Sequence, residues 1–70
     1  FDIIFSDPPY NFTDDQFERI IKIVFNRSLL NAEGYLIIEH SKHSDLSLFP
    51  YFEFSKKYGG SIFSFFLSDQ

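Results

Sequence analysis

The residues best suited to chemistry are Asp7-Pro8-Pro9-Tyr10, which directly follow the apolar run Phe1–Ser6. Two consecutive prolines fix φ, remove two backbone donors and leave carbonyl groups whose direction is set in advance. Asp7 adds a carboxylate, and Tyr10 adds an aromatic face on which a nucleobase could stack. The alternative interpretation is structural, because Asp before Pro often begins a turn and a proline pair often ends a strand.

One amphipathic helix is predicted after this loop. Thr13 and Gln16 form a capping-box pattern, and we expect the helix to end near Leu30, where Asn31 or Gly34 can adopt the left-handed conformation. Its apolar stripe recurs at helical spacing through Phe17, Ile20, Ile21, Val24 and Phe25. Such a stripe predicts that one side of the helix packs on a sheet.

The remaining elements are strands. The first and second apolar runs are of the type buried on both faces in a parallel sheet, whereas the third run alternates, as in an outer strand. Gly59-Gly60 predicts a two-residue hairpin before the last strand. The expected strands are residues 1–6, 35–39, 51–58 and 61–68, with a short helix within residues 40–47.

Composition narrows the class of protein. Seventy residues form at most one small domain, and the absence of cysteine excludes disulfides and thiolate metal sites. The chain has no Met and opens inside a strand-like run, so we interpret it as a piece of a longer protein. The net charge of −4 argues against a phosphate-binding surface here. His40 and His43 are not accompanied by the carboxylate pattern typical of a metal site. No apolar run approaches the length of a membrane span, so we expect a cytoplasmic chain.

The sequence resembles a known group of enzymes. A strand ending in Asp-Pro-Pro-Tyr is similar to motif IV of the amino-methyltransferases that use S-adenosylmethionine and methylate an exocyclic amine of a nucleobase. More specifically, four patterns together resemble the bacterial family that methylates a guanine N2 in small-subunit (16S) ribosomal RNA. They are residues 1–10, residues 29–34, the glycine, strand and Glu-His ending of residues 34–40, and the basic-Tyr-Gly turn of residues 57–61.

The resemblance implies a fold and a cofactor. The fold is α/β, the C-terminal half of a Rossmann-like class I methyltransferase domain, here occupying residues 1–70. Its elements follow the order β-α-β-(short α)-β-β, in which the first two strands are parallel and the last two form an antiparallel terminal hairpin. The glycine-rich turn and the ribose-binding acidic residue of the family are not in this sequence. S-adenosylmethionine would therefore be bound mainly by the missing N-terminal half, and the isolated segment would be inactive and would self-associate.

The resemblance also implies roles for single residues. Asp7, Pro8, Pro9 and Tyr10 would be catalytic, and Asp7 would also contact the cofactor. Acceptors against the N–H bonds of the amine would favour its pyramidal, more nucleophilic form. Tyr10 would stack on the target base. His40 is a candidate substrate contact, with a locally bonded structural histidine as the alternative.

Two other interpretations stay open. One is a DNA adenine-N6 methyltransferase fragment, because Asp-Pro-Pro-Tyr is shared with that group. The other is a non-catalytic binding or assembly domain without a cofactor site. The expected partner is ribosomal RNA or the small ribosomal subunit, reached through the full-length protein. We interpret Lys56, Lys57 and Tyr58 as an exposed strand end in preference to an RNA contact.

Overall fold

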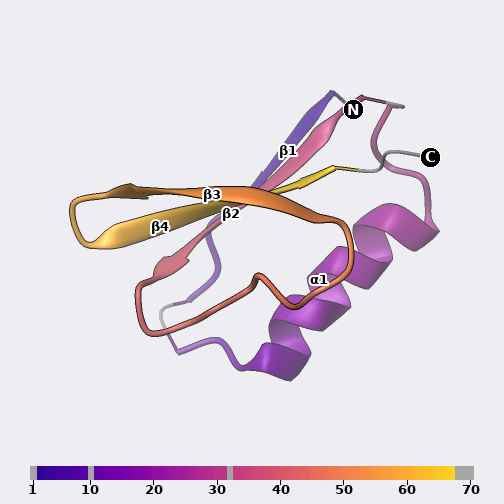
Figure 1. Ribbon diagram of the computed structural model, residues 1–70. Helices are drawn as coiled ribbons and strands as arrows, with labels where there is room; N and C mark the ends of the chain where they lie inside the picture. The colour runs from indigo at the N-terminus through magenta and orange to yellow at the C-terminus, as the bar shows by residue number, and fades with distance from the viewer. Residues whose placement is uncertain (1, 10, 32, 68–70) are drawn as a thin grey trace.

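The computed structural model describes residues 2–9, 11–31 and 33–67, which form a mixed four-stranded sheet with a helix on one face (Figure 1). The strand order is β1-β2-β4-β3, with β1 parallel to β2 and the other neighbours antiparallel. The elements are β1 (Ile3–Ser6), α1 (Asp14–Asn26), β2 (Tyr35–Ser41), β3 (Phe52–Tyr58) and β4 (Ser61–Leu67). The predicted β-α-β unit followed by an antiparallel hairpin is confirmed.

Helix α1 begins as its sequence predicts. The Gln16 N–H donates to Thr13 Oγ1 at 3.3 Å, and the Thr13 N–H donates to Gln16 Oε1 at 2.8 Å. Together these bonds satisfy donors that have no partner inside the helix. Asp14 and Asp15 lie in the first turn, where the helix dipole favours negative charge.

The predicted end of the helix near Leu30 is wrong. Helix α1 ends at Asn26, and Ser28 rather than Asn31 or Gly34 takes the left-handed conformation, with φ 52°. The Leu29 N–H donates to Val24 O at 3.0 Å and the Ser28 N–H to Phe25 O at 3.3 Å, which is the Schellman pattern. The helix stops where its apolar stripe stops, because the polar residues after Phe25 offer the sheet nothing to bury.

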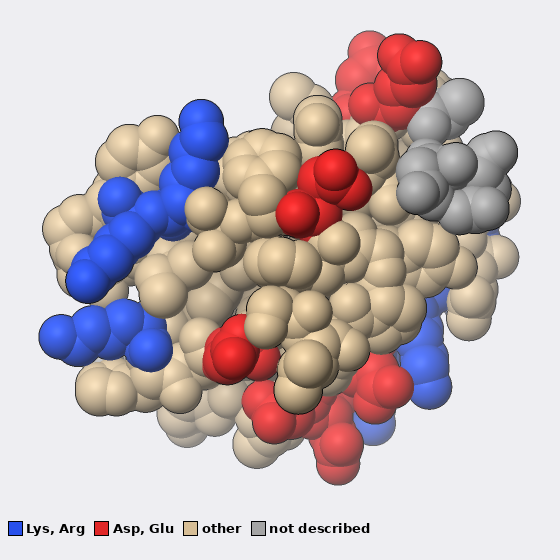
Figure 2. Space-filling model, viewed as in Figure 1, with Lys and Arg blue, Asp and Glu red and all other residues tan. Residues whose placement is uncertain are grey.

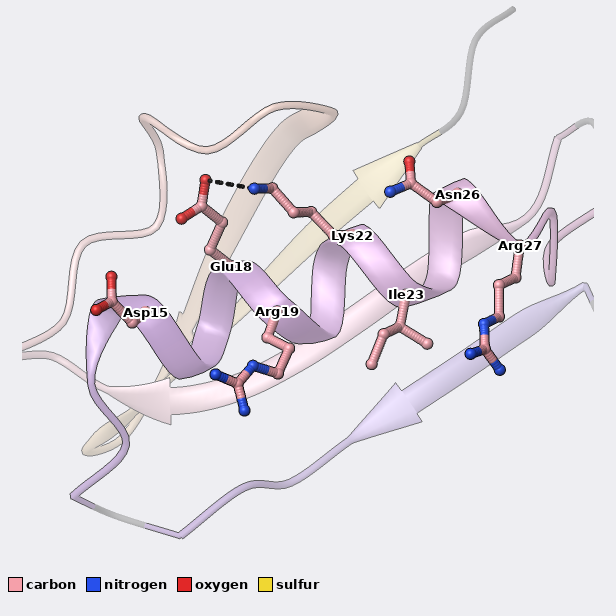
Figure 3. A pocket seen from close by; sticks show the side chains of 7 residues that line it. All are labelled: Asp15, Glu18, Arg19, Lys22, Ile23, Asn26 and Arg27. Atoms are coloured by element: carbon pink, nitrogen blue, oxygen red, sulfur yellow. Dashed lines mark ion pairs between the residues drawn. The ribbon is translucent and has the colours of Figure 1, made fainter.

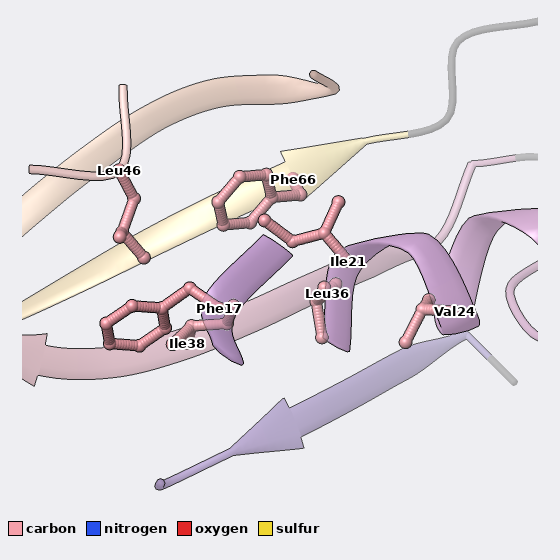
Figure 4. Packing of buried hydrophobic residues seen from close by; sticks show 7 residues of the cluster. All are labelled: Phe17, Ile21, Val24, Leu36, Ile38, Leu46 and Phe66. Carbon is pink, nitrogen blue, oxygen red and sulfur yellow. The ribbon is translucent and has the colours of Figure 1, made fainter. Parts of the chain in front are cut away.

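The core lies between α1 and the sheet (Figure 4). Every second residue of β2 points into it, and the segment after β2 adds one leucine. Burial of such side chains is the main favourable contribution to folding in a domain this small. The buried apolar residues are Phe17, Ile21, Val24, Leu36, Ile38, Leu46 and Phe66.

The opposite face of the sheet carries no helix in the described part of the chain. Ile3 and Phe5 of β1 are 60% and 54% exposed, so the prediction that this strand is buried on both faces is wrong for this chain. The reason is positional, because β1 is an edge strand and α1 covers only one face. Aromatic rings line the open face, with Phe54 and Phe65 stacked at 4.4 Å between centroids.

The hairpin forms as predicted, but the short helix expected before it does not. Gly59, with φ 58°, and Gly60 join β3 to β4, and β3 is the outer strand. Residues 42–51 form turns instead of the expected short helix. Within them the Ser47 N–H donates to Asp45 Oδ1 at 3.0 Å, a local bond that competes with helical hydrogen bonds.

Candidate functional site

A cleft of about 160 Å³ opens at the carboxyl ends of the two parallel strands. Ser6 pairs with Ile38, and the next residues on the two strands are Asp7 and Glu39. Parallel pairing therefore brings the Asp-Pro-Pro loop to the same edge as the Glu-His end of β2. The cleft is lined by Asp7, Pro8, Pro9, Phe17, Glu39, His40, Ser41, Gly60 and Ser61.

The proline loop presents acceptors to this cleft. The carbonyl of Pro9 accepts a hydrogen bond from the Phe12 N–H at 3.1 Å, which closes the turn. Neither the Pro8 carbonyl nor the Asp7 carboxylate has a hydrogen-bond partner among the described residues. Two acceptors on adjacent residues thus remain available to an N–H-bearing ligand. Tyr10, the predicted stacking residue, lies outside the described residues.

His40 forms part of the cleft wall, and its ring nitrogens already have partners within the chain. Nδ1 lies 2.9 Å from the carbonyl oxygen of Ser41, and Nε2 lies 2.7 Å from Ser64 Oγ. A carbonyl can only accept, so Nδ1 carries the proton and the Ser64 hydroxyl donates to Nε2. His40 as a whole is 8% exposed, and its ring meets that of Phe17 edge to face. This arrangement favours the structural alternative for His40 over a hydrogen bond to substrate.

Sequence reasoning missed several residues of this site. Ser64 lies 24 positions from His40, and only the antiparallel register of β2 and β4 brings the two together. The same register pairs Ser41 with Ser61, which places two hydroxyls at the cleft rim. Phe17 belonged to the predicted helical stripe, but nothing in its spacing marked it as the ring against the histidine. The Gly59-Gly60 hairpin sets the register of β3 against β4 but not that of β2 against β4, so no local signal identified these residues.

Among the described residues, those that line the cleft include two acidic ones and no Lys or Arg. Asp7 and Glu39 line it, and Asp45 follows in the segment after β2. The backbone N–H of Ser47 lowers the pKa of the Asp45 carboxyl, with a further lowering by the Ser47 side chain. Among the residues that the structure describes, no group of three or more His, Asp or Glu side chains could hold a metal ion. Within the same residues, no helix has the length and apolarity needed to cross a membrane.

A larger hollow, of about 400 Å³, lies on the outer surface of α1 (Figure 3). Its walls are long charged side chains, including Arg19 and Arg27, and the ion pair between Lys22 Nζ and Glu18 Oε2 at 3.6 Å. Glu18 and Lys22 are four residues apart, the spacing at which oppositely charged side chains on a helix can pair. The hollow contains none of the predicted site residues and shares no lining residue with the cleft, so we place the functional site at the smaller cleft.

Two solved structures share this fold. One, described as a "putative methylase" from Haemophilus influenzae, is 22% identical with a TM-score of 0.75, and the match covers all of this chain and 44% of that one. The other, a conserved hypothetical protein from Streptococcus pyogenes, is 26% identical with a TM-score of 0.74 over 94% of this chain and 42% of that one. The chain thus spans less than half the length of either protein. A search of curated protein sequences gave no significant match. Residues 1–67 match a family described as conserved hypothetical protein 95, and the chain belongs to that family.

Proposed function

We propose that this chain is the catalytic portion of a longer S-adenosylmethionine-dependent methylase. The proposed reaction is methylation of the exocyclic N2 amine of a guanine in small-subunit ribosomal RNA. The observation that carries the proposal is the meeting of Asp7 and Pro8 with the end of β2 at one cleft. Support also comes from the likeness of the fold to the Haemophilus influenzae protein whose name is that of a methylase.

The cleft is suited to an amine because its unsatisfied groups are acceptors. The lone pair of an exocyclic amine is delocalised into the base ring, which makes the nitrogen a poor nucleophile. The Asp7 carboxylate and the Pro8 carbonyl would each accept one N–H bond of that amine. Holding both hydrogens out of the ring plane favours the pyramidal nitrogen as the new N–C bond forms, which stabilises the transition state.

The cofactor would supply the methyl group, and the described cleft has room for only part of the reacting assembly. Its volume of about 160 Å³ is below the roughly 300–1,000 Å³ of pockets that enclose a small-molecule ligand. Asp7 is the residue of this chain that would also contact the cofactor. The rest of the cofactor pocket belongs to the remainder of the proposed longer protein.

His40 has a positioning role in this proposal. Its hydrogen bond to Ser64 ties the end of β2 to β4, and its bond to the neighbouring Ser41 carbonyl fixes the orientation of the ring in the cleft wall. A ring held in one orientation would keep the width of the cleft constant. Constant width matters because a small displacement of the reacting groups lowers the rate of the chemical step. Tyr10 would supply the aromatic face on which the flipped base stacks.

The experiment that tests the function is a methyl-transfer assay on the full-length protein. Tritiated S-adenosylmethionine is supplied with small-subunit ribosomal RNA, assembled small subunits or adenine-containing DNA, and the modified nucleoside is identified by mass spectrometry. We expect N2-methylguanosine in the RNA. Transfer to adenine in the DNA alone would identify the adenine-N6 alternative, and cofactor binding without transfer to any acceptor would indicate a binding or assembly domain.

A further inference from the structure

The six cationic side chains of the chain fall into two groups. Three of them, Arg19, Lys22 and Arg27, lie on α1 and its C-cap. The other three, Lys42, Lys56 and Lys57, lie at the end of the sheet where β3 turns into β4 and where β2 ends. Figure 2 shows this separation, with Lys and Arg gathered at the hairpin end and acidic side chains mainly elsewhere on that face. The overall net charge of −4 conceals this local excess of positive charge.

Strand register places Lys57 beside the cleft. Lys57 pairs with Ile62 on β4, and Ile62 pairs with His40 on β2. Directly opposed residues point to the same face of a sheet, so Lys57 shares the α1 face with His40. The backbones are two strand spacings apart, or about 10 Å. Lys42 is an exposed turn residue that directly follows Ser41 of the cleft wall, so its backbone lies next to the cleft.

Lys56 has the same chemistry in a different place. It pairs with Phe63 and therefore points to the opposite face of the sheet. There its ammonium group lies 5.9 Å from the centre of the Phe54 ring. Two adjacent lysines of β3 thus provide one cation beside the cleft and one turned away from it.

The cleft lysines, Lys42 and Lys57, are exposed and carry unneutralised charge. Among the described residues no carboxylate lies within ion-pair distance of either, whereas Lys22 on α1 is paired with Glu18. The cleft holds the acceptor groups of Asp7 and Pro8, whereas Glu39 pairs with Phe63 and so points to the same face as Lys56. Acceptors at the centre and cations at the rim match a ligand whose N–H donors lie inside and whose negative groups lie outside. A nucleotide with an exocyclic amine within a phosphodiester chain has that distribution of charge.

We propose that Lys42 and Lys57 bind the phosphates that flank the target nucleotide, so that the rim of this cleft is a nucleic-acid interface. This inference rests on the proposed function and adds the surface that holds the polymer. It also revises the interpretation of Lys57 as an exposed strand end, since the register puts Lys57 on the same sheet face as His40 of the cleft wall. Phosphate contacts of this kind position the substrate and are largely independent of sequence.

The test is binding of a fluorescein-labelled 12-nucleotide single strand by the full-length protein, followed by anisotropy from 50 to 500 mM salt. The double variant Lys42→Gln/Lys57→Gln is compared with Lys22→Gln/Lys56→Gln, which removes the same charge and the same residue type elsewhere. Loss of two single-strand contacts should reduce the slope of log Kobs against log salt by about 1.4 and raise Kd roughly 10- to 100-fold at 50 mM salt. Lys42→Arg/Lys57→Arg retains both charges and should bind like the wild type.

Equal losses with RNA and DNA strands would support phosphate contact, because both polymers carry the same phosphodiester. A wild-type slope in the Lys42→Gln/Lys57→Gln protein, or an equal loss in the control, would overturn the inference. A protein that binds through the cleft lysines but transfers no methyl group would contradict the proposed function and leave the interface standing. If the Lys42→Gln/Lys57→Gln protein methylates RNA and binds it with wild-type affinity, the interface is wrong and the proposed function stands.

Discussion

His40 and Ser64 are joined by a buried hydrogen bond of 2.7 Å between Nε2 and Oγ, which links the end of β2 to the middle of β4. With the bond from Nδ1 to the Ser41 carbonyl, it fixes both the tautomer and the orientation of the ring. Ser64 is 1% exposed, so neither partner can replace the bond with water at no cost. The cleft wall is thereby held by a contact that spans 24 residues of sequence.

Removing the Ser64 hydroxyl should destabilise the protein. Ser64→Ala leaves a buried ring nitrogen without a donor, and we expect a loss of about 1–3 kcal/mol in the free energy of unfolding. Ser55→Ala is the matched control, because Ser55 pairs with Ser64 across the sheet but is exposed, and its loss should stay within about 0.5 kcal/mol. Denaturant unfolding measures both values.

Nitrogen NMR of the imidazole provides a second readout for the same pair. The wild-type protein at neutral pH should show the Nδ1–H tautomer of His40, and Ser64→Ala should keep it because the Ser41 carbonyl is unchanged. An Nε2–H tautomer in the wild type, or equal stability of the Ser64→Ala and Ser55→Ala variants, would contradict this account of the cleft wall.

Leu46 and Leu48 provide a comparison of buried and exposed leucines two residues apart. Leu46 is 1% exposed and packs in the core, whereas Leu48 is 92% exposed. Leu46→Ala should cost about 2–5 kcal/mol, and Leu48→Ala should change stability by no more than about 0.5 kcal/mol. Thermal and denaturant unfolding of the two variants check this. Similar melting curves would mean that the segment after β2 does not anchor the core.

Local contacts were predictable from the sequence, and contacts between distant segments were not. The capping box of Thr13 and Gln16 depends on residues three apart, and the hairpin depends on two glycines, so both could be predicted correctly. The end of α1 was placed too late because Ser28, a residue type that rarely adopts the left-handed conformation, stops the helix before Asn31 or Gly34. Leu46 lies in an irregular segment where a short helix was expected, and its burial depends on the assembled helix and sheet rather than on its neighbours in sequence.

The site shows the same division. Asp7, Pro8 and Pro9 are contiguous and recognisable as a motif, and the expected parallel pairing brought them beside His40. The hydrogen bond to Ser64 and the position of Lys57 both follow from the register of β4. A shift of one residue in that register would move each side chain of the strand to the opposite face of the sheet. Register is a property of the assembled sheet, so these residues could not be assigned from spacing alone.

The segment of residues 1–70, isolated from the rest of the proposed protein, should self-associate and should not bind S-adenosylmethionine. Strand β1 has an open edge, and Ile3 and Phe5 expose apolar side chains beside it. An apolar edge strand favours pairing with another chain. Light scattering at micromolar concentration should report a dimer or larger species.

Charge at that edge should reverse the association. Ile3→Lys/Phe5→Lys is expected to shift the segment toward monomer, while Leu48→Lys, which adds a charge at an exposed site elsewhere, should leave it associated. A wild-type monomer that binds the cofactor would contradict this prediction and would mean that the segment forms a cofactor pocket of its own.

Tyr10 is predicted to act through its ring rather than its hydroxyl. In the full-length protein, Tyr10→Ala should weaken substrate engagement by about 1–3 kcal/mol, because a flipped base loses its stacking surface. Tyr10→Phe keeps the ring and should behave nearly like the wild type. Steady-state KM and kcat for RNA methylation compare the two, and equal defects in both variants would remove the stacking role.

The most direct test of the central claim is the effect of Asp7→Ala on methyl transfer by the full-length protein. Loss of an acceptor used mainly in the transition state should lower kcat roughly 10²- to 10³-fold. Cofactor affinity by calorimetry should fall much less, because Asp7 would be one contact of a pocket that belongs mainly to the rest of the protein. Asp7→Asn keeps an acceptor oxygen and should retain more activity, and Glu53→Ala, an exposed carboxylate on β3, should be fully active. The account predicts that, of these three variants, Asp7→Ala has by far the largest loss of tritium transfer to small-subunit ribosomal RNA. Wild-type turnover by Asp7→Ala would contradict it.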